Sequence, residues 1–178
     1  RDETFIRSLG EDYLKYRVDG FLKSPRWPIR NEGVKLVGLL NYQDRVSFIL
    51  SLLQDKTPVS WMQRLFGGDY KQVGFIRRNA VTTIQQLGLY NKEIRKTLLD
   101  LLDDPYYEVR TVATRAFAVL IPQDADTDTE IVTRILDLIQ DRSFEVKAEA
   151  VLTLGKIGPA SVIDDFRPLY LFPNWKVR

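Results

Sequence analysis

Four segments of this 178-residue chain share one spacing of apolar and small side chains. Each opens with Val or Ile followed by Arg or Lys, and has apolar or small residues four, eight and eleven positions later. Successive residues of an α-helix are about 100° apart, so these positions form one stripe along a helix. The segments begin at Ile29, Ile76, Val109 and Val146, and the small residues are Gly33, Ala80, Ala113 and Ala150. The pattern predicts four helices that each bury one face, with a closely packed neighbour at every small residue.

A second, more continuously apolar pattern recurs after three of these segments. It ends in Asp each time and occupies residues 49–55, 98–104 and 135–141. A helix that is apolar around much of its circumference is largely buried, so we expect second helices antiparallel to the first. One such hairpin cannot bury its apolar stripe, whereas a stacked row can. The sequence therefore predicts an all-α fold, a right-handed α-solenoid (an α-α superhelix) of antiparallel helix pairs.

The repeats predict a single repeat domain over residues 1–178. Its parts are a partial repeat at 1–23, repeats at 24–55, 72–104, 105–141 and 142–172, an insertion at 56–71 and a truncated repeat at 173–178. Both ends match pieces of further repeats, so we expect the chain to be a fragment of a longer array. A chain of this length and composition has enough apolar residues for a sizeable core.

The composition excludes several kinds of chemistry. The chain has no Cys and no His, which excludes disulfides, thiolate or imidazole metal ligands, and catalysis by His. No phosphate-binding glycine loop and no nucleophile elbow occurs in the sequence. We therefore expect no enzyme activity, no catalytic residues, no cofactor and no metal. No apolar run approaches the roughly 18 residues that span a membrane, so we expect no membrane insertion. The compartment cannot be identified, and a soluble, cytoplasmic location is the default expectation.

An acidic loop at residues 123–130 contains the D-x-D-x-D spacing that begins a calcium-binding loop. Thr129 and Ile135 stand where that loop needs Gly and Glu. The simpler interpretation is that Asp128 or Thr129 caps the following helix.

The insertion is the best candidate for function. Elsewhere five residues lead from the Asp that ends a second helix to the next Val or Ile, whereas 21 lead from Asp55 to Ile76. Thr57 and Pro58 predict a helix start, and Gly67 with Gly68 predicts its end. Its candidate partner-binding residues are Trp61, Met62, Arg64, Phe66 and Tyr70. Either the apolar residues anchor a partner, or they plug a gap in the fold.

The paired stripes and the D-P-x-Y-x-V-R linker at residues 104–110 resemble HEAT repeats, including the short bacterial HEAT-like kind. That family places an Asp six residues before the Arg or Lys that opens the first helix. The resemblance thus implies a structural ladder of Asp104, Arg110, Asp141 and Lys147. Ser24 and Lys71 stand where Asp is expected before Arg30 and Arg77. We therefore expect the ladder to be incomplete in the N-terminal half.

The resemblance implies a binding module whose second helices line a concave face. We expect a non-enzymatic scaffold that binds another protein through this face and the inserted helix. The alternatives are a nucleic-acid-binding protein related to HEAT-like DNA glycosylases, and a structural spacer in a larger protein. The cations that favour nucleic acid are Arg78, Lys92, Arg95 and Lys96. The net charge is +5 over residues 1–91 and −3 over 92–178, and the acidic half opposes a long phosphate track.

Overall fold

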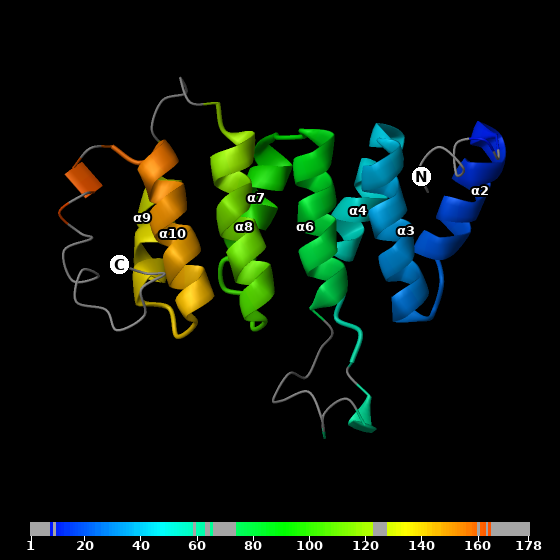
Figure 1. The fold of residues 1–178 in the computed structure, drawn as a ribbon, viewed down its shortest axis with the longest axis horizontal. Helices are drawn as coiled ribbons and strands as arrows, with labels where there is room; N and C mark the ends of the chain where they lie inside the picture. Colours follow the sequence, from blue (N-terminus) through cyan, green and yellow to red (C-terminus); the bar gives the residue numbers. More distant parts are fainter. Residues whose placement is uncertain are drawn as a thin grey trace. The chain divides into compact units, whose positions relative to one another are not determined.

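The structure is a computed structural model that describes residues 10–58, 74–122 and 128–159, together with Ser8, residues 60–62, Leu65, Ser161, Val162 and Asp164. Within them the regular elements are eight α-helices and two short 3-10 helices (Figure 1). These are α2 (Glu11–Leu22), α3 (Trp27–Leu40), η1 (Gln43–Arg45), α4 (Val46–Leu52), α6 (Phe75–Leu87), α7 (Lys92–Leu101), α8 (Tyr107–Leu120), α9 (Thr129–Asp137), η2 (Leu138–Gln140) and α10 (Phe144–Ile157). The prediction of an all-α fold built from helix pairs is confirmed.

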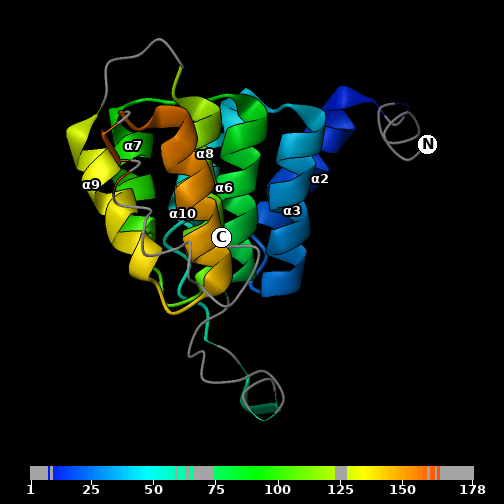
Figure 2. The ribbon, with the colours of Figure 1, turned by 60° about the vertical axis from the view of Figure 1, so that its left-hand side comes forward.

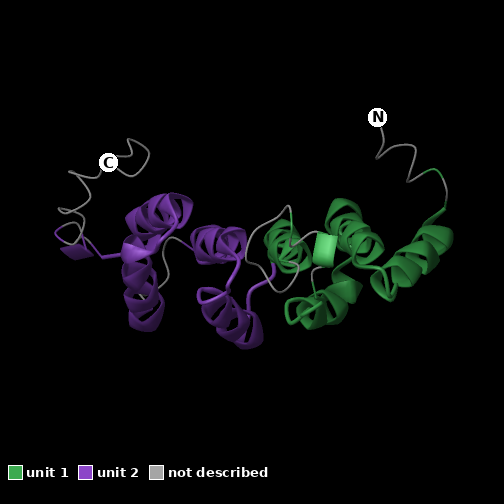
Figure 3. Ribbon diagram, turned by 90° about the horizontal axis from the view of Figure 1, so that it is seen from below, with its two compact units in different colours: residues 1–88 green, residues 89–178 purple. Residues whose placement is uncertain are grey.

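The chain forms two compact units, residues 1–88 and 89–178 (Figure 3). In unit 1, α3 lies between α2 and α6 (Figure 2). The helix α4 packs against α6. In unit 2, α10 packs against α8, α9 and η2, and α8 packs against α7. The boundary between the units falls in the short connection between α6 and α7.

The small residues of the repeated stripe are at close contacts between helices. Ala80, Ala113 and Ala150 are fully buried. A Cβ atom on Gly33 would lie 2.9 Å from the backbone nitrogen of Leu22, so this glycine admits the α2 backbone against α3. The predicted role of the fifth position is confirmed, because a larger side chain there would separate the helices.

The helix ends follow local sequence signals. Asp128 caps α9 by accepting a hydrogen bond from the backbone N–H of Ile131 at 3.2 Å, as the acidic-loop interpretation predicts. Asn91 caps α7 in the same way, accepting from Ile94 at 2.9 Å. Residues 123–127, which hold the rest of the D-x-D-x-D motif, lie outside the described residues.

Candidate functional site

An arginine–aspartate clamp fixes the start of α8 in unit 2. The Arg110 guanidinium donates two hydrogen bonds to the Asp141 carboxylate, both at 2.8 Å, and a third to the backbone carbonyl of Asp104 at 2.7 Å. The two paired side chains are only 7% and 8% exposed. Burial alone would raise the pKa of Asp141, but the bonds from Arg110 and the Ser143 N–H lower it overall. The clamp therefore needs an ionised carboxylate inside the protein.

Unit 1 contains the same clamp at the start of α3. Arg30 donates to the Asp55 carboxylate at 3.1 and 2.9 Å, and to the Ser24 carbonyl at 2.8 Å. The Thr57 N–H donates to Asp55 at 2.8 Å, as the Ser143 N–H does to Asp141. Burial raises the pKa of Asp55, but the hydrogen bonds from Thr57 and Arg30 lower it, and the net shift is downward.

The clamp residues correct the expectation that the ladder is incomplete in the N-terminal half. Arg77 donates to the backbone carbonyl of Asp55 at 2.6 Å, as Arg110 does to that of Asp104. Asp55, and not Lys71, therefore takes the place of the Asp before Arg77. The sequence count was misleading because the insertion separates Asp55 from Arg77 along the chain. In the C-terminal half, Lys147 lies half-buried in the first turn of α10.

The described part of the insertion carries large apolar side chains exposed to solvent. Trp61 is 70% exposed, Met62 54% and Leu65 69%, and all three have helical backbone. The predicted helix start at Thr57 and Pro58 is wrong. Both residues precede the helical backbone, and Thr57 instead bonds the Asp55 carboxylate and accepts a hydrogen bond from Arg30. Three further candidates, Arg64, Phe66 and Tyr70, lie outside the described residues.

The four cations that could bind nucleic acid differ in how far their charges are already balanced by neighbouring groups. Arg95 donates to Asp128 at 2.7 and 2.9 Å and to Glu130 at 2.5 Å, which raises the pKa of Arg95. Its charge is therefore balanced by two carboxylates. Arg78 is half-buried over the Phe75 ring, 5.3 Å from its centroid. Lys92 and Lys96 are exposed on α7.

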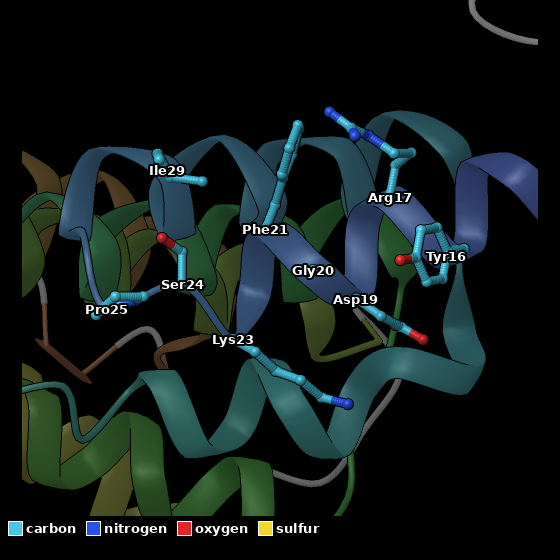
Figure 4. Close-up of a pocket in the computed structure, with 9 residues that line it drawn as sticks. All are labelled: Tyr16, Arg17, Asp19, Gly20, Phe21, Lys23, Ser24, Pro25 and Ile29. Carbon is cyan, nitrogen blue, oxygen red and sulfur yellow. The ribbon is translucent and has the colours of Figure 1, made fainter.

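Unit 1 also has an open pocket that the sequence analysis did not identify. It measures about 670 Å³ and lies along α2 and the start of α3 (Figure 4). Its lining includes Tyr16, Arg17, Gly20, Phe21 and Lys23. Gly20, near the end of the helix, was the available sequence signal, but a pattern of buried residues does not show which exposed residues line a pocket.

Neither a metal-binding group of side chains nor a membrane-spanning helix occurs in the described part of the chain. Its carboxylates form no group of three or more that could hold a metal ion. None of its helices combines the length and the apolar character that crossing a bilayer requires.

The helix pairs and their arginine clamps define a class, the helical repeat proteins. The family model described as HEAT repeats matches residues 96–178, so this part of the chain is similar to HEAT repeats. The predicted resemblance is thus confirmed. None of the curated proteins matches the sequence.

Solved structures share the fold at low sequence identity. A chain in the complex of CpcE and CpcF of phycocyanin lyase from Nostoc sp. PCC7120 is 19% identical, with a TM-score of 0.66. The match covers 90% of the present chain and 59% of that one, so the present chain spans about three fifths of its neighbour. An engineered protein is 17% identical, with a TM-score of 0.61, over 90% of the present chain and 73% of its own. At these identities the likeness shows the fold alone.

Proposed function

We propose that this protein is a non-enzymatic scaffold that binds another protein through the inserted segment and the exposed faces of its second helices. The observation that carries the proposal is the exposure of Trp61, Met62 and Leu65 on a segment that the fold does not need for closure.

The clamp in unit 1 explains why the insertion is not needed to close the fold. Arg30 binds the Asp55 carboxylate and Arg77 binds the Asp55 carbonyl. Asp55 directly precedes the insertion and Arg77 follows it, so these bonds hold the two ends of the insertion together. Further polar contacts hold α6 to α3, namely Asn79 to Asn31 at 2.8 Å and Thr83 to the Val34 carbonyl at 3.0 Å. The exposed side chains of the insertion therefore have no evident packing role.

Exposed aromatic and methionine side chains are typical of interfaces. Trp is enriched among the residues that contribute most to binding, and Met adapts its shape to irregular partner surfaces. Three large apolar side chains in contact with water are unfavourable until a partner covers them. The phycocyanin lyase neighbour is itself one chain of a two-protein complex, which agrees with a protein partner for this fold.

The structure weakens the case for nucleic-acid binding that the sequence suggested. A phosphate track needs several convergent cations with available charge. Arg95 is already paired with two carboxylates, and its helix also presents exposed acids such as Glu93 and Asp100.

The test compares wild type with a graft in which a copy of residues 105–108 replaces residues 56–75. The graft restores the five-residue spacing between Asp55 and Ile76 that the other repeats have. A double variant, Trp61→Ala with Met62→Ala, removes only the anchors, and Leu152→Ala is the control because Leu152 is 63% exposed in unit 2. In pull-downs quantified by mass spectrometry, we expect one protein retained by wild type and control and lost from both insertion variants.

Retention of that protein by the graft would overturn the role of the insertion. A parallel titration with duplex DNA at increasing salt examines the alternative, because each phosphate contact steepens the loss of affinity with salt. Tight DNA binding with a steep salt dependence, lost in Lys92→Glu with Lys96→Glu, would replace the scaffold with the nucleic-acid function.

A further inference from the structure

The outer side of α2 has the features of a seat for another helix. The inner side of α2 buries Leu14, Val18 and Leu22, and α3 packs against the helix. On the outer side, Gly20 is exposed, and a Cβ added there would meet nothing within 4 Å. A glycine is less favourable than alanine in a helix, by up to about 1 kcal/mol in its interior, and an added Cβ at Gly20 would meet no neighbour that accounts for this glycine.

Gly33 shows what such a glycine does elsewhere in the same unit. There the missing Cβ lets the α2 backbone approach α3 until Leu22 N lies 2.9 Å from the Cβ position. Gly20 provides an equivalent close approach on the opposite side of α2, where the pocket of about 670 Å³ is open. A backbone that is bare on one side admits another helix closely.

Two cations flank Gly20 symmetrically. Arg17 and Lys23 stand three residues before and after it, so they point about 60° to either side of the Gly20 direction. Figure 4 shows Arg17 with Phe21 on one side of α2 and Lys23 with Tyr16 on the other. The two cations lie over aromatic rings, Arg17 at 5.4 Å from Phe21 and Lys23 at 5.9 Å from Phe48.

Two cations, Arg17 and Lys23, line the pocket beside Gly20. No carboxylate of the described residues pairs with Arg17 or Lys23. The pocket's own acid, Asp19, is bound by Arg45 at 2.6 Å, so it does not neutralise them. Asp12 lies on the first turn of α2, which places the positive charge on the C-terminal half of the helix.

Two exposed tyrosines precede Gly20 on the outer side of α2. Tyr13 is 53% exposed and Tyr16 is 75% exposed, and they lie one to two turns before Gly20. Tyrosine rings supply apolar contact area and a hydroxyl group at little entropic cost.

We propose that the outer side of α2 binds an acidic amphipathic helix of a protein partner. The bound helix packs a small residue over Gly20 and its apolar stripe over the two tyrosines. Glu or Asp side chains on both flanks of that stripe pair with Arg17 and Lys23. This is the helix-in-groove mode of recognition, with charge selecting the partner. The site does not include the insertion, so this proposal is tested independently of the proposed function.

The test is a selection from a phage-displayed library of 14-residue helical peptides. The apolar stripe is varied and the flanking positions are Glu, Gln or Lys. We expect wild type to enrich Glu-flanked over Gln-flanked peptides roughly tenfold, as two partly exposed ion pairs allow. Gly20→Leu fills the seat and is expected to weaken the selected peptides at least about tenfold in fluorescence anisotropy. Arg17→Glu with Lys23→Glu is expected to reverse the preference toward Lys.

Gly155→Leu is the matched control. Gly155 is also exposed, also has nothing within 4 Å of an added Cβ, and also stands two residues before the last residue of its helix. Residues three positions before and after it are Leu152 and Gly158, so its flanks carry no cation. Equal enrichment of Gln-flanked peptides, or equal weakening by Gly155→Leu, would overturn the site. The insertion graft is expected to bind the peptides as wild type does.

Discussion

Arg77 in unit 1 and Arg110 in unit 2 each bind the backbone carbonyl of an aspartate, and the two contacts differ in the length of chain between the arginine and the aspartate. Asp104 and Arg110 are six residues apart, whereas Asp55 and Arg77 are 22 residues apart. Yet Arg77 and Arg110 both donate to the carbonyl of their Asp, at 2.6 and 2.7 Å. The contact therefore depends on where the second helix ends and the next first helix begins, and not on the length of the connection. We therefore expect that an insertion at this position can change in length without disturbing the packing of the helices.

The largest expected effect is the loss of a clamp arginine. Arg110→Met leaves the Asp141 carboxylate buried without its cation, which costs about 3–5 kcal/mol for a buried pair. Arg30→Met is expected to cost somewhat less, because the Arg30 side chain is 12% exposed against 7% for Arg110. Urea unfolding followed by far-UV circular dichroism measures both free energies.

The control for these variants is the double replacement Arg110→Met with Asp141→Asn. Because it removes both charges, it is expected to recover a large part of the lost stability. If the double variant is as unstable as Arg110→Met alone, the uncompensated charge is not the cause.

Overpacking the small positions is expected to have the next largest effect. Ala113→Leu in unit 2 and Ala80→Leu in unit 1 each place a large side chain at a fully buried site. Both are expected to destabilise by about 1–3 kcal/mol, since neither site has room for the added atoms. The same unfolding experiment measures them, with Thr133→Leu on the exposed side of α9 as control. Unchanged midpoints would contradict the helix register.

Acid is expected to weaken both clamps together. The folded-state pKa values of Asp55 and Asp141 are lowered. Their contribution to the free energy of unfolding is therefore fully present above the unfolded-state pKa of about 4. It is lost as the pH falls through the folded-state pKa. Thermal unfolding at a series of pH values from neutral to about 2 checks this. We expect the drop at low pH to be shallower in the double variant that lacks Arg110 and Asp141, because one of the two carboxylates is absent.

Removal of the insertion is expected to have the smallest effect on stability. Shortening the connection from Asp55 to Ile76 from 21 residues to five lowers the entropy cost of loop closure by about 1 kcal/mol. The graft is therefore expected to unfold at equal or slightly higher urea than wild type. A loss of more than about 2 kcal/mol would indicate that the insertion packs into the fold after all.

The sequence predicted the helix pairs well because burial of a periodic stripe is a local property. Ala80, Ala113 and Ala150 lie where the 3.6-residue period places them. The contacts of Asp55 were missed because Arg30, Asp55 and Arg77 come together only through the packing of α3, α4 and α6. The exposure of Trp61 and the pairing of Arg95 were likewise undetermined, since a helical pattern does not show which side of a helix another segment covers.

The place of the insertion also affects how the chain could be divided. Unit 1 takes α3 and α4 from before the insertion and α6 from after it, and α3 packs against α6. A protease cut between residues 58 and 74 would therefore separate two pieces of one core. The pieces share the Asp55 contacts and the Thr83 bond to Val34, so they are expected to remain associated after cleavage. The same position would suit fragment complementation. The two halves would be produced separately and then mixed, and recovery of the helical circular dichroism signal would report their reassembly.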